Sequence, residues 1–189
     1  YPTLIPALPD TTAPSQLPQL LAKVAPTAIK DTAKAEIGQI RFGLTPNRLA
    51  LLATISDAKV APNHQVPWRS SCIELFGSQT EGAPIGQVWL VPATADQPAK
   101  TYLAIDGKPV ATPENTVIDS VATPNGYTVR ALIPSPALQL AAGGDTVRLE
   151  IQATTHNAAD HKVSYTKAFG SPRAYESSQF YGSFTTNAA

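Results

Sequence analysis

Short runs of alternating apolar and polar residues, separated by turn-forming residues, restrict the fold of this chain more than any other feature. Residues 35–43, 49–55 and 127–133 alternate in this way. Because successive side chains of a strand point to opposite faces, each run has one apolar face. Turn signals at 45–48, 106–107 and 123–126 separate such runs. Roughly ten short strands without a long helical pattern predict an all-β fold, an antiparallel, jelly-roll-like β-sandwich with at most short helical turns.

Prolines set the expected domain boundary. They occur at positions 2, 6, 9, 14 and 18, and this spacing excludes a helix through most of the segment. We therefore expect a Pro-rich lead-in or linker over residues 1–25 and one β-sandwich domain over residues 26–189. A chain of 189 residues is long enough for one domain with a substantial core and too short for two.

The charge balance narrows the class of partner. The chain has 14 Lys and Arg and 14 Asp and Glu residues, so no net field attracts nucleic acid or an anionic membrane. A neutral, hydroxyl-rich partner fits better. No apolar run is long enough to cross a bilayer, and the single cysteine, Cys72, excludes an intrachain disulfide. Because the sequence starts at Tyr1, we expect a processed product or a piece of a longer protein.

Residues 65–77 place an aromatic ring before a strand that carries a carboxylate. Pro67 holds the preceding residue extended, so Trp68 sits where the chain leaves a loop. In the strand that follows, Glu74 shares a face with Cys72 and Phe76. A buried, unpaired carboxylate is costly. Glu74 therefore either faces a ligand or pairs with an arginine, for which Arg48 and Arg130 are available. Trp68 is either a binding ring or a core residue.

The remaining polar residues suggest neither an enzyme nor a defined metal site. No nucleophile elbow, HExxH, P-loop or Rossmann pattern is present, which favours a non-catalytic role. A zinc site made from His156, Asp160 and His161 lacks a fourth ligand, and we expect the histidines, His64 included, to lie at the surface. Asp57, Asp119 or Asp145 could help to hold a structural Ca²⁺, although no ligand loop has the required spacing.

Four segments in a fixed order resemble the family-9 carbohydrate-binding modules and the related haem-binding and sugar-binding DOMON domains. Residues 47–57 are similar to an early strand that ends in an aspartate, and residues 67–76 to a Pro-Trp segment leading into the central strand. Residues 126–134 resemble a Gly-Tyr strand that ends in Ile-Pro, and residues 175–184 resemble the closing segment. The resemblance runs from about residue 30 to the end.

This resemblance implies a sugar slot between two aromatic rings. Trp68 and Tyr175 fall on the positions of these rings, which pack against the C–H faces of a sugar. Glu74 matches a carboxylate that accepts hydrogen bonds from sugar hydroxyls, and Gln87 falls on a polar position of the next strand. Trp89 is expected to pack in the sheet and is the alternative stacking platform. Three loop residues would rim the slot: Arg173, Glu176 and Asn157.

The chain also departs from the family pattern. Ser70 and Ser71 stand where an aspartate is usual, Trp89 replaces an arginine, Tyr175 replaces a tryptophan, and 154–155 replace an Asn-Asp pair. Three functions stay open. The first is a non-catalytic module that binds oligo- or polysaccharide, at the C-terminus of an exported bacterial protein that is secreted, periplasmic or at the cell surface, possibly alongside other domains. The second is a structural or assembly domain. The third is a haem-binding electron-transfer domain of the DOMON type, which would want an axial pair such as His with Met although the chain has no Met.

Overall fold

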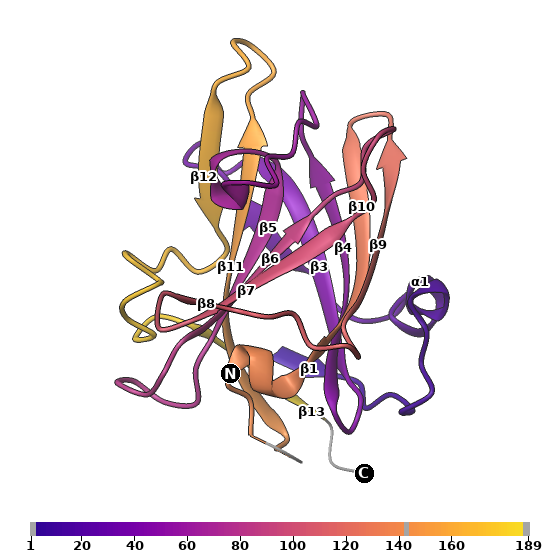
Figure 1. The fold of residues 1–189 in the computed structure, drawn as a ribbon, viewed down its shortest axis with the longest axis vertical. Coiled ribbons are helices and arrows are strands. Elements are labelled where there is room, and N and C mark those ends of the chain that lie inside the picture. The colour runs from indigo at the N-terminus through magenta and orange to yellow at the C-terminus, as the bar shows by residue number, and fades with distance from the viewer. Residues whose placement is uncertain (1–2, 142–143, 187–189) are drawn as a thin grey trace.

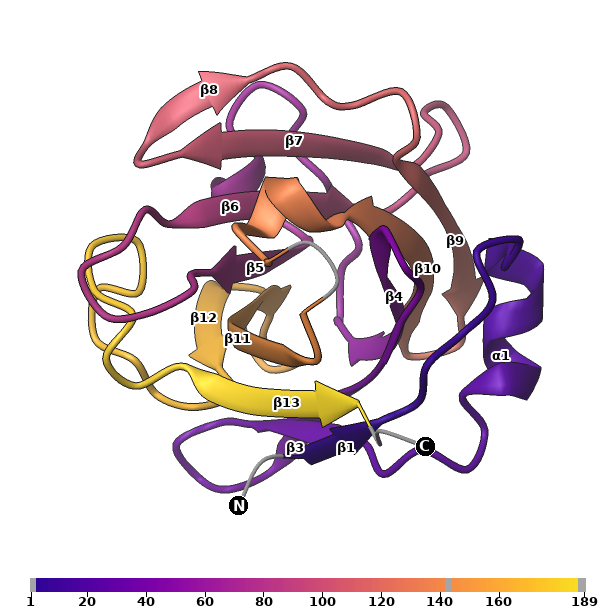
Figure 2. The same cartoon turned by 90° about the horizontal axis from the view of Figure 1, so that it is seen from below.

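The computed structural model describes residues 3–141 and 144–186, which form two β-sheets packed face to face (Figures 1 and 2). In spatial order the larger sheet contains β1 (Thr3–Ile5), β13 (Gly182–Thr186), β11 (Thr146–His156), β5 (Cys72–Gly77), β6 (Gly86–Val91), β7 (Lys100–Ile105) and β8 (Lys108–Val110), with β12 (Val163–Lys167) paired to β11. The smaller sheet contains β2 (Thr27–Lys30), β3 (Glu36–Leu44), β4 (Arg48–Ser56), β10 (Gly126–Pro134) and β9 (Val117–Thr123).

The strands pair almost entirely in the antiparallel sense. Among the named strands of the described residues, β1 and β13 alone pair in parallel, and an isolated parallel bridge joins Ala7 to Leu44. The helical elements are short: η1 (Pro14–Gln16), α1 (Leu17–Leu20), η2 (Pro67–Arg69) and η3 (Ser135–Leu138). This arrangement confirms the predicted all-β antiparallel sandwich with short helical turns.

Alternating residues from both sheets build the core. On β4 the inward residues are Leu49, Leu51, Ala53 and Ile55, all within 1% of complete burial. From the larger sheet, Ile73 and Leu75 on β5 meet them. The outward residues of β5 and β6 are buried as well. The centre of the larger sheet is therefore covered on its outer face as well as on its inner face. The candidate site lies on this outer face.

The N-terminal segment packs against the sandwich, in contrast to the expected lead-in or linker over residues 1–25. Leu8, Leu17 and Leu21 are buried against Ala50 of β4 and Leu132 of β10. Figure 2 shows α1 on the outer side of the smaller sheet. The apolar residues that stand between the prolines are buried here. Because burying apolar surface is favourable, the segment packs on the sheet instead of extending into solvent. The domain boundary at residue 25 itself stays a prediction.

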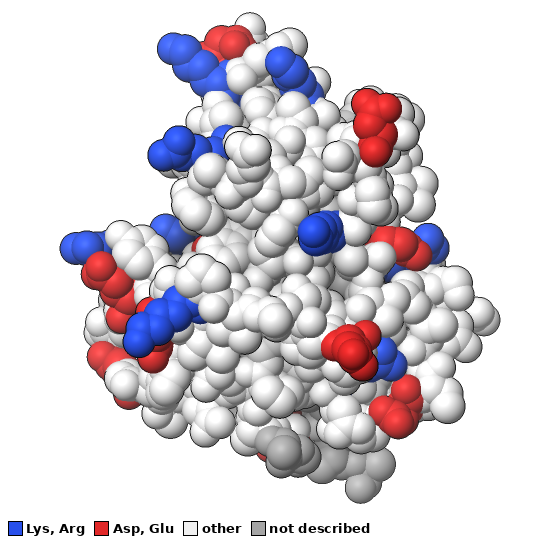
Figure 3. Space-filling model, viewed as in Figure 1, with Lys and Arg blue, Asp and Glu red and all other residues white. Residues whose placement is uncertain are grey.

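Charged side chains are dispersed over the surface. On the face seen in Figure 3, acidic and basic groups lie singly or in small mixed groups between large uncharged areas. Across residues 3–141 and 144–186, no helix has both the length and the apolar character needed to cross a membrane.

Candidate functional site

A groove of about 1070 Å³ lies on the outer face of the larger sheet. The strand register places five side chains of its floor in one row across five strands: Lys167 (β12), Gln152 (β11), Glu74 (β5), Trp89 (β6) and Tyr102 (β7). Residues directly opposite one another on neighbouring strands have Cβ atoms about 5 Å apart. The floor therefore joins charged, amide and aromatic groups on one continuous surface.

Two exposed aromatic rings line this groove from loops at its margin. Trp68 belongs to η2 and is 46% exposed, and Tyr175 lies between β12 and β13 and is 51% exposed. The ring centroids of Trp68 and Trp89 are 5.7 Å apart, with the planes tilted by 44°. Trp89 is only 8% exposed, so it supports Trp68 from below. The two predicted ring positions thus contribute to the same groove.

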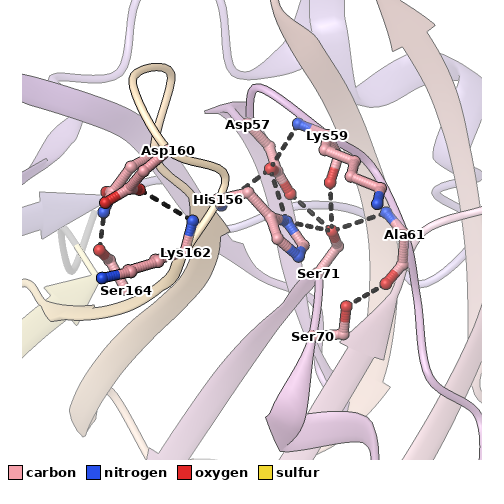
Figure 4. Close-up of polar contacts among 10 residues, drawn as sticks. Asp57, Lys59, Ala61, Ser70, Ser71, His156, Asp160, Lys162 and Ser164 are labelled. Carbon is pink, nitrogen blue, oxygen red and sulfur yellow. Dashed lines mark hydrogen bonds and ion pairs between the residues drawn. The ribbon is translucent and has the colours of Figure 1, made fainter.

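A buried polar cluster of Asp57, Ser71 and His156 holds the loop that carries Trp68 (Figure 4). Ser71 Oγ donates to Asp57 Oδ2 at 2.6 Å, and His156 Nδ1 lies 3.0 Å from Asp57 Oδ1. Ser71 Oγ also accepts from the backbone N–H of Ala61, whose carbonyl accepts from Ser70. The two serines therefore fasten the loop. The expected surface position of His156 is wrong, because its side chain is 8% exposed.

A second anchor holds the loop that carries Tyr175. Glu150 on β11 is fully buried and accepts from the backbone N–H of Phe169 at 3.0 Å and of Ser171 at 3.1 Å. It also accepts from its neighbour's N–H and from the hydroxyl of Ser171. Nearer the C-terminal end of the loop, Tyr181 donates its hydroxyl proton to the Ala174 carbonyl. Tyr175 therefore sits on a segment fixed on both sides.

Glu74 is the buried acid of the groove floor. It is 4% exposed, and the side-chain amide of Gln87 donates to its Oε2 at 3.3 Å. Burial raises the pKa of Glu74 to about 7, while Gln87, Trp89 and the positive charge of Lys167 lower it. Trp89 acts on the carboxylate by proximity, since its Nε1–H has no acceptor in hydrogen-bond geometry.

The alternative in which Glu74 pairs with an arginine is wrong. Arg130 binds Asp119 at 2.7 Å, and Arg48 donates to the Asn115 and Asp10 carbonyls. Glu74 therefore keeps its carboxylate on the groove side of the sheet.

Two of the three expected rim residues lie outside the groove. Arg173 pairs with Glu176 at 2.8 Å, and its guanidinium carbon lies 5.9 Å from the centroid of the Tyr175 ring. It therefore supports the ring while only Glu176 of this pair lines the groove. Asn157 accepts from Ser164 within the β11–β12 loop. That hairpin projects beyond the sheet at the top of Figure 1, and Asn157 is not among the residues that line the groove.

The expected metal-ligand candidates do not converge. Within the described part of the chain, no three His, Cys, Asp or Glu side chains are grouped so that they could hold a metal ion. Asp160 accepts from the backbone N–H of Lys162, and His156 is taken up by Asp57. Asp119 is paired with Arg130, and Asp145 accepts from Thr146. Neither the zinc set nor the calcium set is assembled by these residues.

Sequence reasoning missed three of the five side chains in the floor row. Gln152, Lys167 and Tyr102 line the groove, as do His64 and Tyr165. His64 Nδ1 lies 2.9 Å from the Tyr102 hydroxyl, so His64 is a groove residue. Alternation along β7 and β11 assigns such residues to a face, but only the pairing of β5 with β11, which are distant in sequence, places Gln152 beside Glu74 and Lys167 in the same row.

Three solved structures are similar to this chain in fold. No protein-family model and no curated protein matches the chain. A family-9 carbohydrate-binding module from Caldicellulosiruptor kristjanssonii in complex with cellotriose has a TM-score of 0.71 at 12% identity, covering 98% of this chain and 94% of that one. A glucose complex of a family-9 module from that organism gives 0.64 at 13% identity, covering 89% and 87%. A Bacteroides uniformis protein with a proposed carbohydrate-binding role gives 0.66 at 12% identity, covering 97% of each chain.

Proposed function

We propose that this protein, which has the fold of family-9 carbohydrate-binding modules, binds oligo- or polysaccharide without catalysis in the groove of its larger sheet. The observation that carries the proposal is the pair of exposed rings, Trp68 and Tyr175, beside a buried polar floor. The C–H face of a sugar packs on an aromatic ring, while its hydroxyls need hydrogen-bonding partners. Glu74 and Gln87 supply those partners at the centre of the floor.

Two further points support a saccharide. The groove is lined by three acids, of which only Glu74 is buried, and two lysines, and the whole chain has no net charge, which suits a neutral polymer better than a polyanion. The structurally similar modules are complexes with cellotriose and glucose. We further propose that the chain acts as a module of an exported bacterial protein, at a place where saccharide polymers are met outside the membrane.

A glycan array with wild type and Trp68→Ala side by side tests this function. Wild type is expected to bind a defined group of glycans, and the variant is expected to lose at least tenfold in affinity because one stacking face is gone. Phe180→Ala is the matched control, since Phe180 is 53% exposed and lies outside the groove lining. No glycan signal from the wild type, together with a stable oligomer in solution, would favour the assembly function instead.

A further inference from the structure

We infer that Arg173 is a positioning residue, which holds the ring of Tyr175 from outside the groove and so sets how this ring meets a saccharide. This inference rests on the proposed function. Arg173 is not among the residues that line the groove, whereas Tyr175 and Glu176 are. An effect of Arg173 on a ligand in the groove therefore passes through its two neighbours.

The backbone of Arg173 has an uncommon conformation. Its φ is 51°, in the left-handed region that residues other than Gly, Asn, Asp and His rarely adopt. Its carbonyl accepts from the backbone N–H of Glu176 at 2.8 Å and of Ser177 at 3.1 Å, so the turn of the Tyr175 loop is built on this conformation. Glycine would adopt the same φ without strain. An arginine here carries a conformational cost, and strain of this kind clusters at functional sites.

The side chain of Arg173 contacts both neighbours that line the groove. Its Nη2 lies 2.8 Å from Oε1 of Glu176, and its guanidinium carbon lies over the Tyr175 ring, 5.9 Å from the ring centroid. A guanidinium at this distance is attracted to the face of an aromatic ring. The ion pair with Glu176 holds the guanidinium in place, and the guanidinium in turn borders the ring. One face of Tyr175 is therefore backed by the protein, which leaves the opposite face for stacking on a sugar.

The stability of the fold does not account for this arrangement. The side chains of Arg173 and Glu176 are 67% and 51% exposed, and exposed ion pairs contribute little to stability. The backbone of the loop is already held by Glu150 and by Tyr181. Without Arg173, the half-exposed ring of Tyr175 loses its support. Ordering a freely moving side chain on binding costs affinity, so the role of Arg173 lies in binding.

A double-mutant cycle between Arg173 and Tyr175 tests this role, with affinities measured as concentration series on a glycan array that carries cello- and xylo-oligosaccharides. Arg173→Gly should weaken binding about three- to tenfold, the cost of ordering one side chain. In the Tyr175→Ala background the same change should alter affinity by less than about twofold, because the ring through which Arg173 acts is absent. The urea midpoint of Arg173→Gly should stay within about 0.3 M of wild type, since glycine adopts this φ without strain.

Lys34→Gly is the matched control. Lys34 is also an exposed cationic residue with a positive φ, 63°, and it lies outside the groove lining. This variant should therefore bind glycans as wild type does.

Wild-type affinity in Arg173→Gly, while Tyr175→Ala binds more weakly, would overturn the positioning role and leave the proposed function intact. An equal loss in both backgrounds would also overturn it, because Arg173 would then act on the glycan without Tyr175. So would wild-type affinity in Tyr175→Ala, or a clear fall in the urea midpoint of Arg173→Gly, which would show that Arg173 only supports the fold. No glycan binding by the wild type would overturn the proposed function, and this inference with it.

Discussion

At the residue scale, Glu74 has the most demanding environment in the groove. Its carboxylate is nearly fully buried and receives one hydrogen bond, from Gln87. A buried carboxylate normally has several donors or a cationic partner. Here Lys167 acts only through its positive charge, and burial raises the pKa to about 7. The residue is therefore kept at an energetic cost, as expected for a group that completes its hydrogen bonds with a ligand.

Glu74→Gln is predicted to stabilise the protein in a pH-dependent way. The unfolded carboxyl titrates near its ordinary value of 4.5 and the folded one near 7. Between these values the folded state binds more protons, so wild-type stability falls as the pH rises. The variant should therefore be more stable than wild type by about 1–3 kcal/mol at pH 8, with the difference disappearing below pH 4.5. Urea unfolding at both pH values measures this. A difference that does not change with pH would contradict the assigned burial.

At the element scale, two irregular loops hold the aromatic rings, and buried polar groups fix both loops. The Asp57, Ser71 and His156 cluster joins the end of β4 to the loop of Trp68. Glu150 joins β11 to the loop of Tyr175. Each anchor is a carboxylate that accepts several hydrogen bonds, which secures an irregular backbone without repetitive structure. The spacing of the rings therefore depends on residues that no ligand would touch.

Glu150→Ala is predicted to destabilise the fold and to weaken saccharide binding together. The change leaves three backbone N–H groups and one hydroxyl without their acceptor. We expect a loss of about 3–5 kcal/mol in the free energy of unfolding, measured by urea titration. Glu150→Gln keeps one side-chain oxygen as an acceptor and should lose less. Wild-type stability in Glu150→Ala would show that this anchor does not hold the loop.

At the scale of the whole molecule, local patterns specified the strands, while long-range pairing made the site. Alternation in 49–55 and 127–133 marks the faces of β4 and β10 correctly. The register that brings Gln152 beside Glu74 joins β11 to β5, segments about eighty residues apart, as long-range pairings commonly do. No local pattern contains that information. The burial of Leu8, Leu17 and Leu21 against the smaller sheet likewise depends on contacts between distant segments.

The central claim is that a saccharide lies against the aromatic rings of this groove. The chain has two tryptophans, and both line the groove. The most direct measurement is therefore a ¹⁵N NMR titration that follows their two indole N–H signals, assigned with Trp68→Phe and Trp89→Phe. Adding a glycan selected on the array should shift both signals along one saturation curve. A glycan that binds and moves amide signals elsewhere, while both indole signals stay in place, would contradict the account.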